Sequence, residues 1–255
     1  MKIKILGGNF IRETKFSVLI IGKYVLKVPF SLFALRELRM EAKNIIKAKK
    51  DPFFSFFVPQ SKYFFIVKVA PYLDLLINNL CRERLIGEYF KFAFKDSSGW
   101  EKKSLKETID SEYFLKFIKD YLPESYNWWK NHLEYLKVAS SSAHGDFHLD
   151  NIAVKDNKLF FIDWIRYRSL SSRYFDLLDF YIFSKKKEKE SWMEVWRKEA
   201  CSQEVFGVNI DRDNWMAYGI WKTAEELKTI YLRKDLKYKR KKYINFINKL
   251  KEVVL

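Results

Sequence analysis

The most concentrated polar chemistry in this sequence lies in the stretch HGDFHLDN, which runs from His144 to Asn151. Twelve residues after its asparagine, the apolar run FFIDW contains a single carboxylate, Asp163. A carboxylate beside an attacking hydroxyl can orient or accept its proton, and carboxylate and amide oxygens are good ligands for Mg²⁺. The residue types and their order therefore indicate Asp146 as a base, with Asn151 and Asp163 as ligands of a hard metal ion.

These side chains match the requirements of phosphoryl transfer from a nucleotide to a hydroxyl. In that reaction the protein makes few covalent bonds: it positions the phosphates, neutralises their charge and orients the nucleophile. Asp146 would orient the acceptor hydroxyl, Asn151 would offer an amide oxygen to a metal, and Asp163 would hold the metal that bridges the phosphates. The remaining requirement is a cation over the α- and β-phosphates, which other elements must supply.

The N-terminal part of the chain predicts strands around one helix. Apolar residues at helical spacing predict the helix over 32–50, and the Gly22–Lys23 pair predicts a hairpin turn between two strands. The expected strands, rich in β-branched and aromatic residues, are 2–6, 15–22, 23–30, 56–60 and 62–73. This part is therefore expected to be a small α+β unit on an antiparallel sheet.

From about Asp74 onward the sequence predicts mainly helices, over 73–94, over 109–139 and after Tyr174. The exception is 151–164, where two apolar runs flank an Asp156–Asn157 turn and predict a hairpin. The change in texture predicts two domains, 1–72 and 73–255.

The segments HGDFHLDN and FFIDW resemble the catalytic and metal-binding segments of the aminoglycoside phosphotransferase and choline kinase group. The matched core spans about Ala143 to Phe180, and RYFDLLDF adds Asp176, which would have a structural role in the helix after the metal loop. The resemblance implies a protein-kinase-like, two-lobed α+β fold, with a small antiparallel-sheet lobe carrying one helix and a larger, mainly helical lobe. It also implies ATP and Mg²⁺ as cofactors and a hydroxyl as the phosphate acceptor.

The resemblance also implies a phosphate-binding set in the N-terminal part. Lys27, on the third expected strand, resembles the kinase lysine that contacts the α- and β-phosphates. Its partner would be Glu41 or Glu37, and Glu41 is favoured because it lies deeper in the helix. Gly7 and Gly8 would present backbone amides to the phosphates. Ordinary alternatives remain open, since such a lysine can cover apolar surface with its stem and a Gly-Gly pair often forms a simple turn.

Two further positions follow from the same resemblance. The segment VKVAPYL would connect the lobes, which places Val69, Ala70 and Tyr72 near the adenine, although a plain core strand is equally consistent. His144 would brace the catalytic loop. His148 is expected to be a satisfied, partly buried histidine, although an approach to substrate stays open.

The charge of the chain bears on the acceptor. Its 48 Lys+Arg against 32 Asp+Glu give a formal net charge of +16, which indicates an anionic partner or simply a solvated basic surface. Residues 228–251 hold ten Lys/Arg and one Asp, above an apolar stripe of Tyr243, Ile247, Leu250 and Val254. The continuation after Asp163 is similar to bacterial lipopolysaccharide core kinases. This similarity favours a sugar or glycolipid acceptor among small molecules, and leaves an anionic membrane surface open as a partner.

Several function classes are disfavoured. Cys81 and Cys201 have no metal-ligand spacing, and no uncharged apolar run approaches the ~18 residues of a membrane span, so a cytoplasmic protein is expected, with a peripheral position at the inner membrane face left open. An atypical protein kinase lacks support because no Ala-Pro-Glu-like anchor follows Asp163. A catalytically silent module that binds anionic polymers through the basic C-terminal helix would not need all three of Asp146, Asn151 and Asp163. Nucleic acid is therefore not expected as a partner.

Overall fold

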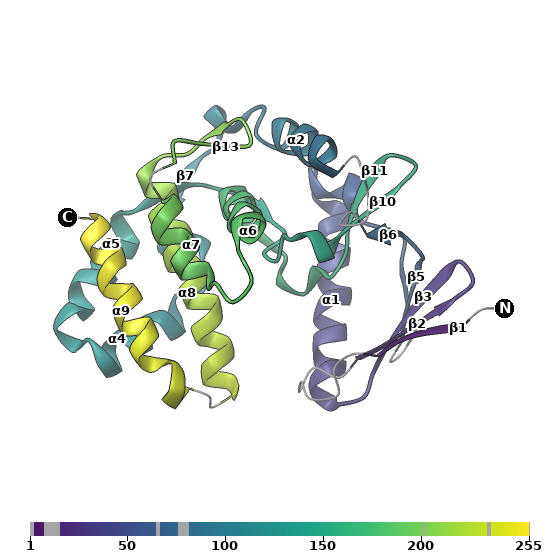
Figure 1. The fold of residues 1–255 in the computed structure, drawn as a ribbon, viewed down its shortest axis with the longest axis horizontal. Helices are drawn as coiled ribbons and strands as arrows, with labels where there is room; N and C mark the ends of the chain where they lie inside the picture. Colours follow the sequence, from purple (N-terminus) through teal and green to yellow (C-terminus); the bar gives the residue numbers. More distant parts are fainter. Residues whose placement is uncertain are drawn as a thin grey trace. The chain divides into compact units, whose positions relative to one another are not determined.

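The computed structural model describes residues 3–7, 16–64, 67–75, 82–200, 202–233 and 236–254 (Figure 1). The chain divides into two compact units, Met1–Ile86 with His144–Ser169 (unit 1) and Gly87–Ala143 with Leu170–Leu255 (unit 2). Unit 1 therefore combines the N-terminal sheet with the segment that carries the polar cluster. The predicted domains 1–72 and 73–255 describe expected functional lobes and stay a prediction.

Unit 1 is built on a five-stranded antiparallel sheet with the order β1-β2-β3-β5-β4. Its strands are β1 (Ile3–Gly7), β2 (Phe16–Ile21), β3 (Tyr24–Pro29), β4 (Lys62–Phe64) and β5 (Val67–Pro71). The predicted turn joins β2 to β3, and Gly22 adopts φ +57° there, a conformation that favours glycine. The register sets Lys27 of β3 opposite Lys68 of β5.

The helix predicted in the N-terminal part is α1 (Leu32–Lys50), which has the bounds that the sequence predicts. Ser31 caps its start by accepting a hydrogen bond from the Ala34 N–H at 3.0 Å. Its buried residues follow the helical period and are Ala34, Leu38, Glu41, Ile45 and Ala48. Glu41 is the one charged member of this stripe, so the helix directs a carboxylate into the interior.

Two strand predictions in unit 1 are wrong in detail. The strand expected over 56–60 does not form, because the chain turns through a short 3₁₀ helix, η1 (Phe54–Phe57). Asp51 initiates this turn, since its Oδ1 accepts hydrogen bonds from the N–H groups of Phe53 and Phe54, both at 2.9 Å. The single strand expected over 62–73 is instead the antiparallel pair β4 and β5. The fold class is confirmed, because the five-stranded sheet with one helix is present.

The hairpin predicted around Asp156–Asn157 is confirmed. It consists of β10 (Ile152–Lys155) and β11 (Lys158–Phe161), and β6 (Asp74–Leu75) pairs with β10. Both turn residues have positive φ, 51° and 55°, a conformation that aspartate and asparagine tolerate. The 3₁₀ helices η5 (Leu149–Asn151) and η6 (Trp164–Arg166) precede and follow the hairpin.

Aromatic side chains hold the hairpin to the rest of unit 1. Phe54, Phe147, Phe161 and Trp164 are fully buried. The Phe54 ring meets the Trp164 ring edge to face, with centroids 5.5 Å apart, and Phe147 meets Phe161 in the same way at 4.9 Å. This packing fixes the two ends of the hairpin, which are the ends that carry the polar cluster and Asp163.

Unit 2 is mainly helical, as the sequence predicts. Its helices are α3 (Leu105–Thr108), α4 (Glu112–Tyr121), α5 (Tyr126–Tyr135), α6 (Arg173–Lys185), α7 (Trp192–Glu199), α8 (Arg212–Arg233) and α9 (Leu236–Val254), with 3₁₀ turns η3 (Ser97–Gly99) and η4 (Pro123–Ser125). Its short strands are β7 (Lys102–Ser104), β8 (Lys137–Ala139), β9 (Ser141–Ala143), β13 (Glu204–Val205) and β14 (Val208–Asn209). Helix α2 (Arg82–Ala93) and strand β12 (Arg168–Ser171) each contain a point where the chain passes between the units, and a third such point follows β9, between Ala143 and His144. The helix expected over 73–94 is described over Arg82–Ala93, and Asp74 and Leu75, near its expected start, form β6 instead.

The apolar stripe of the last helix packs as expected where it is described. Tyr243, Ile247 and Leu250 are buried, and the Val254 side chain lies outside the described residues. Cys81 and Cys201 also lie outside them. Over the ranges that the structure describes, we find no helix with the length and apolar character that crossing a membrane requires.

Candidate active site

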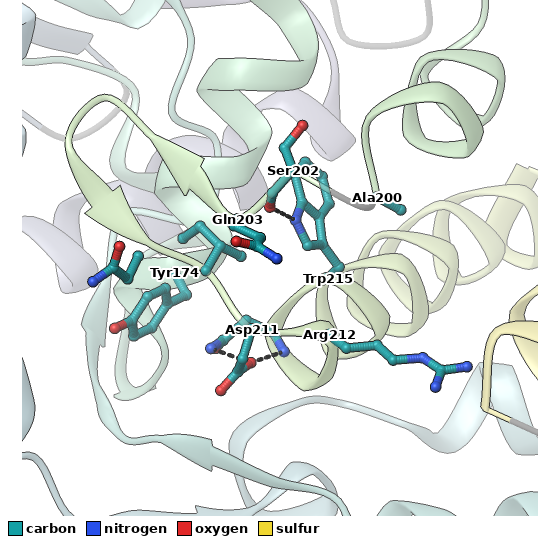
Figure 2. A pocket seen from close by; sticks show the side chains of 10 residues that line it. Tyr174, Ala200, Ser202, Gln203, Asp211, Arg212 and Trp215 are labelled. Carbon is teal, nitrogen blue, oxygen red and sulfur yellow. Dashed lines mark hydrogen bonds between the residues drawn. The ribbon is translucent and has the colours of Figure 1, made fainter.

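A cavity of about 730 Å³ lies in unit 2 (Figure 2). Several of the residues that line it make hydrogen bonds within unit 2. Asp211 Oδ1 accepts hydrogen bonds from the backbone and side-chain amides of Asn214, at 2.7 and 2.6 Å, at the start of α8. Trp215 Nε1 donates to the Ser202 carbonyl at 2.9 Å. The residues that line this cavity do not include any of the predicted site residues.

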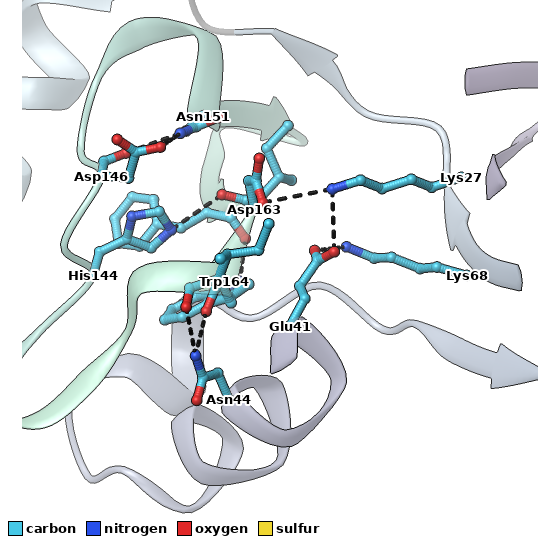
Figure 3. A network of polar contacts seen from close by, with 12 residues as sticks. Lys27, Glu41, Asn44, Lys68, His144, Asp146, Asn151, Asp163 and Trp164 are labelled. Atoms are coloured by element: carbon cyan, nitrogen blue, oxygen red, sulfur yellow. Dashed lines mark hydrogen bonds and ion pairs between the residues drawn. The ribbon is translucent and has the colours of Figure 1, made fainter. Parts of the chain in front are cut away.

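A second cavity, of about 650 Å³, lies within unit 1 and collects most of the predicted site. The predicted residues among those that line it are Lys27, Glu41, Ala70, Tyr72, Asn151 and Asp163. They come from β3, α1, the end of β5, η5 and the turn after β11. Figure 3 shows the polar contacts that join several of them.

The cation and carboxylate expected from the sequence are in contact. Lys27 Nζ lies 3.2 Å from Glu41 Oε2, so Glu41 is the partner rather than Glu37. A third member, Lys68, was not predicted from the sequence; its ammonium contacts the other carboxylate oxygen, Glu41 Oε1. Glu41 is fully buried and both of its oxygens are occupied. A lysine in the middle of an apolar strand was the available signal for Lys68.

The buried charges stabilise one another. Burial alone would raise the pKa of Glu41, but Lys68 and Lys27 outweigh it and hold that pKa below its usual value. Burial likewise opposes the charged form of Lys27, yet Asp163 and Glu41 raise its pKa above the usual value. Both side chains are therefore ionised at neutral pH.

Asp163 occupies the turn between β11 and η6 in an unusual backbone conformation. Its φ of 61° and ψ of 65° lie in the left-handed region, which costs most side chains energy and is least unfavourable for aspartate and asparagine. Its Oδ1 is buried without a hydrogen bond and lies 3.5 Å from Lys27 Nζ. Burial raises the pKa of Asp163, against the opposing influence of Lys27. A cation at this carboxylate would relieve the cost of its burial.

The turn that carries Asp163 is held from α1. Asn44 Nδ2 donates to the carbonyls of Trp164 and Ile165, at 2.9 and 2.8 Å. Trp164 Nε1 in turn donates to the Phe161 carbonyl at 2.7 Å. Asn44 was not identified from the sequence, because a single asparagine on a helix face gives no sign of a partner 120 residues away.

The loop from His144 to Asn151 brings Asp146 and Asn151 together. Asn151 Nδ2 donates to the Asp146 backbone carbonyl at 2.9 Å and to Asp146 Oδ2 at 3.1 Å. Because both partners are acceptors, the amide nitrogen must face them, and the amide oxygen is the group that Asn151 can present to a cation. Arg166 Nη1 lies 3.4 Å from Asp146 Oδ1, and His148 Nε2 lies 3.7 Å from Oδ2. Asp146 thus lies beside the Asn151 amide and the Arg166 guanidinium and keeps a quarter of its side chain exposed.

The residues before Asp146 shape this loop. Gly145 has φ +79°, and a Cβ added to it would lie 2.4 Å from the Arg166 carbonyl oxygen. His144 is fully buried, with Nε2 3.1 Å from the Ile162 carbonyl. Burial lowers the pKa of His144 to about 4, so the ring is neutral and carries its proton on Nε2. His144 can therefore position the loop but cannot touch a substrate.

The other predicted nucleotide contacts have mixed placements. Ala70 and Tyr72 line the unit 1 cavity, and the Tyr72 N–H donates to the Lys23 carbonyl at 2.8 Å. Val69 instead pairs with Leu26 and Lys62 within the sheet. Gly7 is the last residue of β1, and Gly8 lies outside the described residues. Asp176, for which a structural role was predicted, is buried on α6 of unit 2.

The donor set fits a hard divalent cation only in part. In the described ranges, no group of three or more His, Cys, Asp or Glu side chains is arranged to bind a metal by itself. Asn151 and Asp163 line the same cavity and supply oxygen atoms, and Asp163 Oδ1 lacks a hydrogen bond. The residues therefore suit Mg²⁺ that completes its coordination with phosphate oxygens and water, as it usually does with nucleotides.

Comparison with known proteins shows similarity of structure rather than of sequence. No protein-family profile and no curated protein sequence matches the chain. Choline kinase LicA from Streptococcus pneumoniae superposes with a TM-score of 0.59 at 17% identity, covering 99% of this chain and 94% of that one. LicA in complex with AMP superposes at 0.55, with 16% identity and coverage of 99% and 94%. A thermostable mutant of aminoglycoside phosphotransferase APH(4)-Ia superposes at 0.55, with 9% identity and coverage of 98% and 94%.

These matches extend over almost the whole length of both chains. At such low identity they establish the fold alone. The protein-kinase-like fold implied by the motif resemblance is therefore confirmed.

Proposed function

We propose that this chain, which has the fold of choline kinase and aminoglycoside phosphotransferase structures, is an ATP- and Mg²⁺-dependent phosphotransferase acting on a hydroxyl of a small molecule. The observation that carries the proposal is the convergence, on one cavity of unit 1, of Lys27 with its partner Glu41 and of the oxygen donors Asn151 and Asp163. A phosphate-binding cation and two metal ligands are the parts that phosphoryl transfer requires.

Each residue of the candidate active site has a distinct role in this proposal. Lys27 binds the α- and β-phosphates, and Glu41 keeps its ammonium oriented. Asp146 orients the acceptor hydroxyl and takes its proton as the γ-phosphoryl group is transferred to the hydroxyl oxygen, while the bond from the γ-phosphorus to the bridging oxygen breaks and ADP leaves. Asn151 and Asp163 hold Mg²⁺, which when bound neutralises charge on the phosphates. His144 and Gly145 position the loop that carries Asp146.

The adenine is assigned to the end of β5. Ala70 and Tyr72 line the same cavity as Lys27, which supports this placement. LicA has been solved in complex with AMP, and this also supports a nucleotide in a chain of the same fold. Val69 is the weakest member of the predicted set, because it is not among the residues that line this cavity.

The acceptor is a small molecule with a hydroxyl group. The similar structures are named for choline and for aminoglycosides, which supports this class. Within it, the sequence favours a sugar or glycolipid hydroxyl. A screen of choline, sugars and glycolipid headgroups with labelled ATP would identify the acceptor, and transfer to a protein substrate alone would contradict the class.

Thermal shift with Mg²⁺-ATP tests the nucleotide site. We expect ATP to raise the melting temperature of the parent protein and to lose this effect in Asp163→Ala. Slow ATP hydrolysis without acceptor should also disappear in Asp146→Ala and Asp163→Ala. Asp96→Ala is the matched control, since Asp96 is an exposed aspartate of unit 2. If the parent shows no shift, or if the site variants hydrolyse ATP as the control does, the proposal is wrong.

A further inference from the structure

We propose that Lys68 is a positioning residue that gives Glu41 a counter-ion of its own, so that Lys27 keeps its charge for the nucleotide phosphates. The inference rests on the proposed function, because it assigns a phosphate to the end of the cavity where these residues meet. Nothing in the motif resemblance calls for a second lysine at this place.

The register of the sheet creates the arrangement. Lys27 and Lys68 are directly opposite one another on neighbouring antiparallel strands. Like charges in that position repel, and the pair would destabilise the sheet if nothing lay between the two ammonium groups. Glu41 projects from α1 between them, with one oxygen on each lysine (Figure 3). A carboxylate that paired with Lys27 alone could direct both of its oxygens to that ammonium group, whereas Glu41 uses one oxygen for each lysine.

The balance of charge shows what the division achieves. Lys27, Lys68 and Glu41 together carry one net positive charge, held largely away from water. In this structure Asp163 supplies the compensating negative charge, 3.5 Å from Lys27. When Asp163 instead binds a cation, the described carboxylate that remains beside Lys27 is that of Glu41, which Lys27 shares with Lys68. The charge of Lys27 then requires another anion. The three-residue cluster, with its net positive charge, is therefore suited to bind a phosphate.

Stability alone does not account for Lys68. Its side chain is only 8% exposed, and it stands in a strand whose neighbours are Val67 and Val69. Well-packed apolar residues in place of buried ion pairs are often neutral or stabilising. Lys68 also lines the cavity beside Lys27, where its charge acts on whatever enters.

Removing the charge of Lys68 should convert this end of the cavity from neutral to negative. In Lys68→Met, Lys27 would be the remaining cation of the cluster beside Glu41 and Asp163. Glu41 would then draw the Lys27 ammonium away from the phosphates. We expect affinity for tripolyphosphate and for ATP to fall by about tenfold or more, because charges at this depth interact strongly. Adenosine has no phosphate, so its affinity should stay within about twofold of the parent value, since no charge interaction is lost.

The experiment is isothermal titration calorimetry with tripolyphosphate, ATP and adenosine as separate probes. Lys68→Arg keeps the charge and should retain binding, whereas Lys68→Gln keeps a donor without the charge and should resemble Lys68→Met. Lys68→Gln also serves if Lys68→Met does not fold. Lys62→Met is the matched control, because Lys62 is an exposed lysine on the adjacent strand β4. In steady-state assays, the KM for ATP should rise in Lys68→Gln while kcat changes little.

The possible results separate the two proposals. A parent protein that does not bind ATP overturns the proposed function. A parent that binds ATP, with Lys68→Gln and Lys68→Met binding tripolyphosphate equally well, overturns the role of Lys68. Equal losses of ATP and adenosine binding would also overturn it, because they would indicate a collapsed cavity rather than a changed charge.

Discussion

Protonation of His144 should destabilise the folded protein in mildly acidic solution. The ring is fully buried, and Nε2 donates to the Ile162 carbonyl at 3.1 Å. It packs against the Trp164 ring, with centroids 4.8 Å apart. Burial depresses the pKa of the ring, and the nearby Asp146 carboxylate compensates only in part, leaving the pKa at about 4. The imidazole must therefore remain neutral for the loop to keep its structure.

The size of the effect follows from the difference in pKa between the folded and unfolded chains. An unfolded histidine has a pKa of about 6.5, so the unfolded chain binds the proton more tightly and falling pH favours unfolding. The stability contributed by neutral His144 is complete above about pH 6.5 and is lost progressively as the pH falls towards 4. At about 1.4 kcal/mol per pKa unit, the total loss approaches about 3 kcal/mol, and about 2 kcal/mol of it occurs between pH 7 and pH 5.

Two measurements test this prediction. The chain has only 3 histidines, so NMR titration of the imidazole nitrogens can be assigned by single substitution to glutamine. Urea unfolding at pH 7 and pH 5 should show the parent losing about 2 kcal/mol more than His144→Gln, which does not titrate but retains a donor. A His144 resonance that titrates at pH 6 or above, or equal pH dependence in parent and variant, would refute the reasoning.

Three other substitutions test particular contacts. Gly145→Ala places a Cβ 2.4 Å from the Arg166 carbonyl at φ +79°, so we expect hydrolysis of ATP to fall by about a hundredfold or more in a kinetic assay, because misplaced catalytic groups lose rate steeply. Asn44→Ala removes the donor to two carbonyls of the Asp163 turn and should lower the free energy of unfolding by about 1–3 kcal/mol while reducing the thermal shift caused by Mg²⁺-ATP. In unit 2, Lys222 Nζ lies 2.6 Å from the fully buried Asp179, and Lys222→Met should cost about 3–5 kcal/mol in urea unfolding because it leaves that carboxylate uncompensated. A loss below about 1 kcal/mol would show that Asp179 is stabilised by other groups.

The local elements were largely predictable from the sequence. The bounds of the helix over 32–50 can be predicted from the sequence, because its apolar residues recur at helical spacing and a serine precedes them. The hairpin around Asp156–Asn157 was readable for a similar reason, since these residue types tolerate positive φ. The strand predicted over 56–60 does not form, and the single strand predicted over 62–73 is two strands, β4 and β5. At 56–60 the conformation is set instead by the stacking of Phe57 on Phe161 of the hairpin and by Asp51 Oδ1, which accepts hydrogen bonds from the N–H groups of Phe53 and Phe54.

The chemistry of the candidate site divides in the same way. The segments HGDFHLDN and FFIDW were sufficient to predict Asp146, Asn151 and Asp163 as site residues, because they bring these polar residues close together in the sequence. The roles of Lys68 and Asn44 were not predicted, since each residue contacts a partner that is distant in the sequence. Only the sheet register sets Lys68 opposite Lys27, and only the packing of α1 brings Glu41 between them. Residue types and spacing determine which groups are available, whereas the burial of charge on neighbouring elements determines which of them must pair.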